Sequence, residues 1–97
     1  MIFEWNIAKS EVNSKNHGIS FTEAEAAFED FFAIEEFDEQ HSTAQEHRFK
    51  MLARADEKIL VVIYTVRGDN YRIISARMAE KSEREFYEKQ RSEDSIE

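Results

Sequence analysis

The stretch "KILVVIYTVRGDNYRIISAR", residues 58–77, decides the fold of this chain. Residues 58–66 are almost all apolar and β-branched, which is typical of a strand in the interior of a sheet. The tetrapeptide "RGDN", residues 67–70, then predicts a tight hairpin turn into a second strand over residues 71–76. We therefore expect an antiparallel pair of strands at the centre of the domain.

Further strands are predicted around this pair. Residues 46–55, "EHRFKMLARA", alternate in part between basic and apolar side chains. Residues 31–37, "FFAIEEF", form a shorter apolar run. A short strand, "IFEW", comes first, at residues 2–5. Together these segments predict an antiparallel β-sheet meander.

Two helices are predicted in the N-terminal third, each with a capping signal. Asn6 is suited to cap a helix over residues 7–16, and Gly18 follows at the usual C-terminal position. Ser20 opens a capping box for a second helix over residues 22–29. The buried stripe of this helix is formed by Phe21, Ala24, Ala27 and Phe28. With one more helix at the C-terminal end, the expected fold class is α+β, in a single domain over residues 1–97.

Composition limits the kinds of function. The chain contains no cysteine, which excludes disulfides and thiolate metal sites. Neither a signal peptide nor a membrane-spanning run is present, so we expect a soluble cytoplasmic protein that binds no membrane. Residues 1–46 hold eleven Asp and Glu against two Lys, whereas residues 47–91 hold eleven Lys and Arg against seven acids. The acidic half suits a basic partner protein, and the basic half can hold phosphates.

The closing helix, predicted from about residue 78 to residue 90, carries a basic stripe. At ~100° per residue, Phe86 is expected to face the sheet and Tyr87 to lie at the edge of the buried side. The residues expected on the outward side are Arg77, Lys81, Arg84, Glu88 and Arg91. A solvated helix face laced with ion pairs is the alternative explanation of this stripe.

Four motifs resemble the BrnT family of type II toxins, a branch of the RelE-like ribonucleases. They are "FEWNIAKSEVNSKNHGISFTEAEAAFED" at residues 3–30, an H-x-x-x-x-E-x-R spacing from His41 to Arg48, "VVIYTVRGDNYRIISAR" at 61–77, and "EREFYE" at 83–88. The resemblance implies a small toxin that cleaves RNA without a metal or other cofactor. It also implies a partner, a ribbon-helix-helix antitoxin of the BrnA type, which neutralises the toxin within a toxin–antitoxin oligomer.

The resemblance extends to individual positions that can carry the chemistry. Metal-free RNA cleavage needs a base for the 2′-hydroxyl proton, cations for the charge on phosphorus oxygens, and an acid for the leaving oxygen. His17 is the candidate base or acid, and Tyr87 a candidate stacking group or weak proton donor. The candidate phosphate-binding residues are Arg48, Arg72, Arg77 and Arg84. The remaining family-like positions are Trp5, Lys9, Asn13, Glu46 and Arg67.

Each candidate also has a structural explanation. His17 ends a helix, where the dipole favours an imidazolium without any catalysis. Tyr87 could lean its ring on the sheet edge, and Trp5 is suited to the core. Arg72 could be tied to Glu46 or to Glu35 across the sheet.

Two other ideas are weighed against the toxin hypothesis. His41 and His47 lie near Asp38 and Glu46, but their spacing matches no usual zinc motif, so no metal site is predicted. A non-catalytic relative would keep the surface that binds a partner or RNA phosphates without cutting RNA. A binding module unrelated to toxicity is the third class, and an adjacent gene for a small ribbon-helix-helix protein would argue against it.

Overall fold

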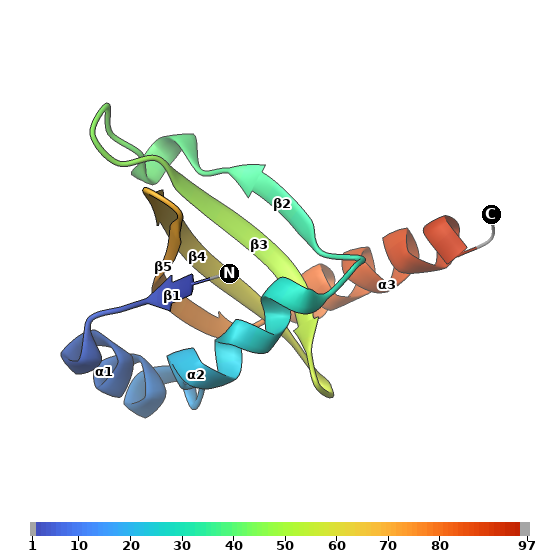
Figure 1. The fold of residues 1–97 in the computed structure, drawn as a ribbon. Coiled ribbons are helices and arrows are strands. Elements are labelled where there is room, and N and C mark those ends of the chain that lie inside the picture. Colours follow the sequence, from blue (N-terminus) through green and yellow to red (C-terminus); the bar gives the residue numbers. More distant parts are fainter. Residues whose placement is uncertain (1, 96–97) are drawn as a thin grey trace.

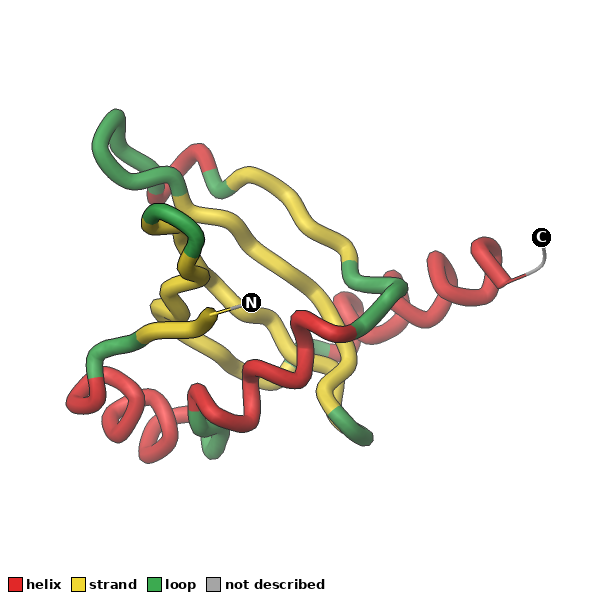
Figure 2. The backbone as a smooth tube through the Cα atoms, in the orientation of Figure 1, coloured by secondary structure: helices red, strands yellow, loops and turns green. Residues whose placement is uncertain are grey.

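The computed structural model describes residues 2–95, with side chains through residue 93, and contains a five-stranded sheet with helices on both faces (Figure 1). The strand order is β1-β5-β4-β3-β2. The elements in chain order are β1 (Ile2–Glu4), α1 (Ile7–His17), α2 (Phe21–Ala24), η1 (Glu25–Glu29), β2 (Ile34–Phe37), η2 (Glu39–His41), β3 (Arg48–Ala55), β4 (Lys58–Arg67), β5 (Asn70–Met78) and α3 (Lys81–Ser95). Figure 2 shows the same path as a tube. The predicted α+β class is confirmed.

The strand at the centre of the sheet is β4, as its run of apolar residues predicts. β3 and β5 pair with it antiparallel on its two sides, and Val61 and Val62 are 2% and 0% exposed. The turn from β4 into β5 has Gly68 at φ 60°, a backbone conformation that residues with a Cβ disfavour. Arg67 therefore lies opposite Asn70 across a two-residue turn.

The direction of β1 differs from the predicted antiparallel meander. β1 lies at the edge of the sheet and pairs parallel with β5, so that Phe3 lies opposite Tyr71. The other pairings within residues 2–95 are antiparallel. A parallel pair needs a long crossover, and the whole chain between β1 and β5 supplies it. A three-residue strand carries no pattern that encodes this direction, and the sheet is mixed.

The two N-terminal helices form where predicted, but the second is irregular. Asn6 accepts a hydrogen bond from the backbone N–H of Lys9 (3.1 Å), and Gly18 ends α1 in the left-handed conformation with φ 71°. Ser20 caps α2 by accepting a backbone N–H at 3.0 Å. After one turn α2 passes into the 3₁₀ helix η1, in place of the continuous helix predicted over residues 22–29.

β2 is shorter than the strand predicted over residues 31–37. It begins at Ile34, because the Asp30 carboxylate accepts a hydrogen bond from the backbone N–H of Phe32 (2.9 Å) and holds a turn there. Phe31 is 91% exposed on this turn. The apolar composition of the run concealed the turn that Asp30 makes.

Each face of the sheet has its own hydrophobic core. α2 and η1 lie over one face, and α3 lies against the other at one end of the sheet (Figure 1). α1 packs against β5, where the side chain of Asn13 binds the backbone of Ala76. The core under α2 and η1 includes Phe21, Ala24, Ala27, Met51, Leu60, Val62, Tyr64 and Ile73, with Trp5 and Phe28 packed against it. The core under α3 is formed by Leu52, Ile59, Val61, Ala79 and Tyr87.

The closing helix starts later than predicted, and this changes which residue faces the sheet. β5 stays extended to Met78, and the backbone N–H of Ala79 donates to the Ile59 carbonyl (2.9 Å), so α3 begins at residue 81. Tyr87 is 1% exposed and Phe86 is 49% exposed, so the predicted positions of these two rings were wrong. None of the helices within residues 2–95 combines the length and the apolar character needed to cross a membrane.

Candidate functional site

The pairing of β3, β4 and β5 aligns basic side chains on one face of the sheet. Arg48 and Arg72 lie opposite the same β4 residue, Thr65, from its two sides. Lys50 is two residues beyond Arg48, and Arg77 pairs with β4 four residues from Thr65, so both belong to the same face. This is the face on which α3 covers one end. We call the part with Arg48, Lys50, Arg72 and Arg77 the open face.

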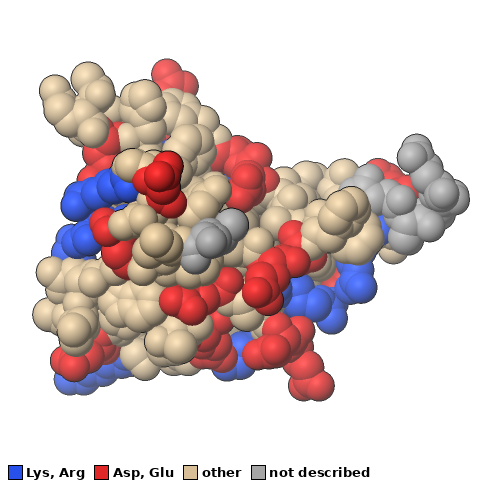
Figure 3. All heavy atoms as spheres, in the orientation of Figure 1, with Lys and Arg blue, Asp and Glu red and all other residues tan. Residues whose placement is uncertain are grey.

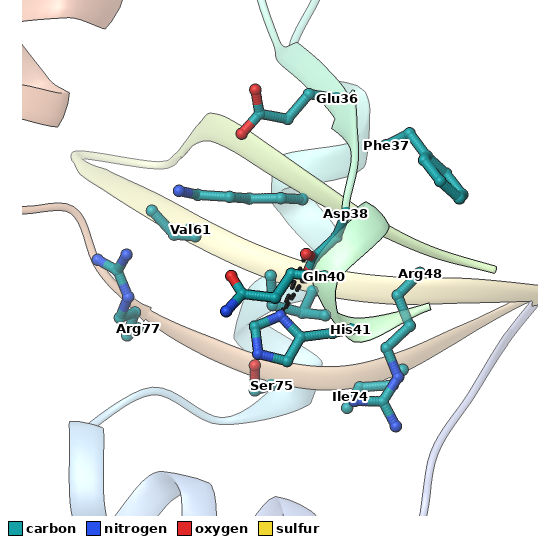
Figure 4. Close-up of a pocket in the computed structure, with 12 residues that line it drawn as sticks. Glu36, Phe37, Asp38, Gln40, His41, Arg48, Val61, Ile74, Ser75 and Arg77 are labelled. Carbon is teal, nitrogen blue, oxygen red and sulfur yellow. Dashed lines mark hydrogen bonds and ion pairs between the residues drawn. The ribbon is translucent and has the colours of Figure 1, made fainter. Parts of the chain in front are cut away.

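A cavity of about 490 Å³ lies on the open face, where the segment after β2 passes over the sheet (Figure 4). The charged and titratable side chains that line it are Glu36, Asp38, His41, Arg48, Lys50 and Arg77. Two of the predicted phosphate-binding residues, Arg48 and Arg77, therefore share one cavity.

A second cavity, of about 440 Å³, lies along α1 and contains the predicted histidine. Lys9 and His17 line it from α1, and Arg48 and Ile74 line it from the sheet. Arg48 and Ile74 also line the first cavity, so the two cavities adjoin. Ile74 is the residue of β5 skipped by the irregular register between β4 and β5. Together the two cavities bring His17, Arg48 and Arg77 to one surface.

Asn13 fixes α1 against β5 and so sets the position of His17. Its amide nitrogen donates to the carbonyls of Ile19 (2.9 Å) and Ala76 (2.7 Å), and its amide oxygen accepts the Ala76 backbone N–H (3.1 Å). The residue is 7% exposed. Asn13 is a family-like position, but its pairing with a residue 63 positions away is not visible in the sequence.

The cations of the open face are ion-paired. Arg77 donates two hydrogen bonds to the Glu83 carboxylate, at 2.8 and 3.0 Å, and Lys50 lies 3.7 Å from the same carboxylate. The hydrogen bonds from Arg77 hold the pKa of Glu83 well below its usual value, at about 2. The same pairing raises the pKa of Arg77. Glu83 thus neutralises part of the cavity from the first turn of α3.

Two further carboxylates hold the remaining arginines. Glu46 accepts from Arg48 (2.8 Å) and from Arg67 (3.3 Å), and the Arg48 hydrogen bond lowers the pKa of Glu46 first, with help from Arg67. Arg72 donates to Glu4 at 3.4 Å, so its partner is in β1. The predicted alternative, that Arg72 is ion-paired, is therefore confirmed. Its partner is Glu4, and not Glu46 or Glu35 as considered from the sequence.

Arg84 and Tyr87 lie outside the lining of both cavities. The Arg84 guanidinium donates to the carbonyl of Ala79 (2.8 Å) at the start of α3. The Tyr87 hydroxyl donates to the Asp30 carboxylate at 2.6 Å, and burial together with this bond raises the pKa of Tyr87 to about 12. Both side chains attach α3 to neighbouring backbone and side chains.

Charge is unevenly distributed over the surface. Figure 3 shows acidic side chains over much of the side that carries β1 and α2, with lysine and arginine gathered at its rim. Within residues 2–95, no three potential metal-ligating side chains are grouped closely enough to hold an ion. The site therefore offers cations and imidazoles, which are the groups suited to phosphate binding and proton transfer.

These features define a small α+β protein with two adjoining cavities that contain arginine, lysine and histidine side chains. Over residues 5–83 the sequence matches the model of BrnT, the ribonuclease toxin of type II toxin–antitoxin systems. The chain belongs to this family, which confirms the resemblance of its motifs, and it is therefore a toxin of the ribonuclease class with an antitoxin as its family's partner. Comparison with curated proteins gives no significant match.

Proposed function

We propose that this chain is a metal-independent, RelE-like endoribonuclease that acts in the cytoplasm as one toxin domain and is neutralised by a ribbon-helix-helix antitoxin of the BrnA type. The observation that carries the proposal is the position of Arg48, which lines both cavities. An RNA backbone lying over Arg48 has His17 on one side and Arg77 on the other. Bidentate arginine contacts are suited to phosphate oxygens.

The reaction uses the RNA's own 2′-hydroxyl as the nucleophile. The 2′-oxygen forms a bond to phosphorus, the bond from phosphorus to the 5′-oxygen breaks, and the 2′-proton passes to a base. A proton from an acid or from water completes the 5′-hydroxyl, and the other product ends in a 2′,3′-cyclic phosphate. Arg48 and Arg77 stabilise the negative charge that grows on the phosphorus oxygens.

RNA phosphates would have to replace carboxylates that are paired with the arginines in the free protein. Glu83 and Glu46 occupy guanidinium groups that a phosphate would use. A phosphate that replaces a carboxylate keeps the arginine paired while the carboxylate turns to solvent. Because these pairs are partly exposed, the exchange costs little.

The direct test is cleavage of a short synthetic RNA by antitoxin-free protein at low salt, in EDTA. We expect a 2′,3′-cyclic phosphate product, and an RNA with a single 2′-deoxy sugar at the cleaved position should resist. Cleavage that requires a divalent metal contradicts the proposed chemistry. Equal cleavage of the RNA with the 2′-deoxy sugar and of the unmodified RNA contradicts it as well. RNA that is bound and left intact between pH 6 and 8 supports the non-catalytic binder in its place.

The proposed antitoxin is tested separately from the chemistry. Complementary charge speeds and orients association, and the acidic surface suits a basic antitoxin segment. We expect the ribbon-helix-helix protein encoded beside this chain's gene to co-elute with it in size-exclusion chromatography and to suppress cleavage. Separate elution of the two co-expressed proteins argues against this partner.

A further inference from the structure

A histidine–carboxylate pair lies in the larger cavity and is used by none of the roles above. The Nδ1 atom of His41 lies 2.9 and 3.1 Å from the two carboxylate oxygens of Asp38. The Asp38 side chain is 15% exposed, whereas that of His41 is 61% exposed. The carboxylate is thus mostly enclosed, and the imidazole it holds remains accessible.

The pair is fixed to β3 rather than carried on a loose loop. The backbone N–H of Asp38 donates to the Arg48 carbonyl (2.8 Å). The hydroxyl of Ser42 donates to the Asp38 carbonyl (2.6 Å) and accepts the Arg48 backbone N–H (2.8 Å). These bonds bracket η2 on both sides and set His41 relative to Arg48.

The imidazole shares its cavity with three cationic side chains and two carboxylates. In Figure 4 the His41 ring lies between Arg77 and Arg48, beside Ser75. The charged groups that share this cavity with it are Glu36 and Asp38 from β2 and its following segment, Arg48 and Lys50 from β3, and Arg77 from β5. With Nδ1 held by the carboxylate, Nε2 is the atom free to meet a substrate.

We propose that His41 is the base that takes the 2′-hydroxyl proton, and that Asp38 is its positioning residue. The proposal rests on the ribonuclease function proposed above. His41 Nε2 takes the proton as the 2′-oxygen bonds to phosphorus, and Asp38 stabilises the imidazolium that results. His17, in the adjoining cavity, is left to supply the proton that the leaving 5′-oxygen takes up.

The third histidine of the chain provides the contrast. His47 lines neither of the two cavities, and its ring contacts the edge of Phe37 at 5.6 Å between centroids. The spacing of His41 and His47 with Asp38 and Glu46 matches no usual zinc motif, whereas one carboxylate paired with one imidazole suits proton transfer. His47 is therefore the matched control for a histidine substitution.

The test compares His41→Gln, Asp38→Asn and His47→Gln in RNA cleavage and in binding of a 2′-O-methyl RNA, which has no 2′-hydroxyl to react. His41→Gln should slow cleavage about 100-fold or more, the size of a general-base contribution, with binding within about twofold on the affinity scale. The pH profile of cleavage should also differ from that of the unsubstituted protein, because the base is absent. Asp38→Asn should slow cleavage less and keep binding, and His47→Gln should change neither.

The outcomes separate the two proposals. If the unsubstituted protein cleaves and His41→Gln retains its rate and pH dependence, His41 is not the base and the ribonuclease proposal stands. If His41→Gln loses cleavage and binding together, His41 contributes to RNA binding alone, and the assignment is overturned. If the unsubstituted protein cleaves no RNA, both proposals fall. Because His41 is largely exposed, we expect His41→Gln to fold. Circular dichroism and urea unfolding check the folding of each variant.

Discussion

The guanidinium of Arg77 holds the carboxylate of Glu83 through two parallel hydrogen bonds, of 2.8 and 3.0 Å, and so ties the end of β5 to the first turn of α3. The same carboxylate accepts the backbone N–H of Glu80 (2.8 Å), which caps the helix. Arg77 also lines the larger cavity. One ion pair therefore both docks the closing helix and occupies a cation of the proposed RNA surface.

The stability of the protein should depend on this pair in a pH-dependent way. The pKa of Glu83 is about 2 in the folded protein, against an ordinary value of 4.5. Its stabilising contribution is fully present above about pH 4.5 and is lost as the pH falls toward 2. Glu83→Gln should lower the free energy of unfolding at pH 7 by about 1–2 kcal/mol, since Arg77 is partly exposed and solvent screens the pair.

Urea unfolding at several pH values measures this contribution. The difference between Glu83→Gln and the unsubstituted protein should shrink as the pH falls below about 4.5. Glu85→Gln is the control, because Glu85 is 66% exposed and lies 4.0 Å from its partner lysine. A difference for Glu83→Gln that stays constant down to pH 2 would show that the ion pair is not its source.

Releasing Arg77 should also change RNA binding. Without the Glu83 carboxylate, a phosphate meets a guanidinium that has no acidic partner to displace. We expect Glu83→Gln to bind 2′-O-methyl RNA several-fold more tightly at low salt, as removal of about 1 kcal/mol of competition implies. Fluorescence anisotropy measures the affinity, and weaker binding by this variant contradicts an RNA contact at Arg77.

The hydroxyl of Tyr87 should contribute to stability rather than to cleavage. It donates to Asp30, which also accepts the backbone N–H groups of Phe32 (2.9 Å) and Arg54 (2.8 Å), so Tyr87→Phe removes one bond to a charged group. The expected loss is about 1–3 kcal/mol in the free energy of unfolding. Cleavage per folded molecule should stay unchanged, and a large fall in rate at full folding would place Tyr87 in the chemistry.

The raised pKa of Tyr87 gives a second signature. The pKa is about 12, against 10 for an ordinary tyrosine, because the ring is buried and the hydroxyl is bonded to Asp30. The stabilisation is present below about pH 10 and is lost as the pH rises toward 12. Tyr87→Phe should therefore be less sensitive to alkaline unfolding than the unsubstituted protein.

The parts of the fold that follow local rules could be predicted from sequence. The apolar run of β4 and the caps at Asn6, Gly18 and Ser20 depend on residues within a few positions of one another. The direction of β1 and the later start of α3 depend on tertiary contacts. The pattern of the closing helix placed Phe86 toward the sheet, whereas the buried ring is Tyr87.

The family motifs pointed to six side chains, and only part of this set is brought together. His17, Arg48 and Arg77 lie around two adjoining cavities, whereas Arg72, Arg84 and Tyr87 line neither of them. The acids that neutralise Arg48 and Arg77 lie only two and six residues away along the chain, whereas the partner of Arg72 is Glu4, 68 residues away. His41 was recognised in a family-like spacing but given no chemical role, because its orientation by Asp38 depends on the 3₁₀ turn between them.

Asn13 should affect cleavage through the position of His17. Asn13→Ala removes three buried hydrogen bonds between α1, Ile19 and Ala76, so we expect it to lower the free energy of unfolding by about 2–3 kcal/mol. Among molecules that remain folded, the rate should fall. Adding Asn13→Ala to His17→Ala should slow cleavage no further, because Asn13 is expected to act only through the position of His17.

The control for this cycle is Ser14→Ala, an exposed change on the same helix. It should leave both stability and rate unaltered. Rate losses that multiply in the double variant of Asn13 and His17 would mean that Asn13 acts independently of His17.

Cleavage should depend on the arginines of the open face at least as strongly as on His17. Loss of one well-placed charge-stabilising donor costs about 100- to 1,000-fold in rate, and a general acid contributes a comparable factor only when well placed. His17 follows Asn16, an uncharged residue, whereas Arg48 and Arg77 lie in one cavity with Lys50. We therefore expect Arg77→Ala to slow cleavage as much as His17→Ala or more, and Lys89→Ala, an exposed change on α3, to have little effect.

The salt dependence of RNA binding distinguishes the loss of a phosphate contact from the loss of a proton-transfer group. Each phosphate contact releases counterions, with a slope of about −0.7 in log affinity against log salt per contact for single strands. Arg77→Ala should therefore weaken binding of 2′-O-methyl RNA and make its salt slope shallower by roughly one contact. His17→Ala should slow cleavage and leave the salt slope unchanged, because His17 is expected to transfer a proton and not to hold a phosphate. An unchanged slope in Arg77→Ala would remove this arginine from the RNA contact and leave its bond to Glu83 as its role.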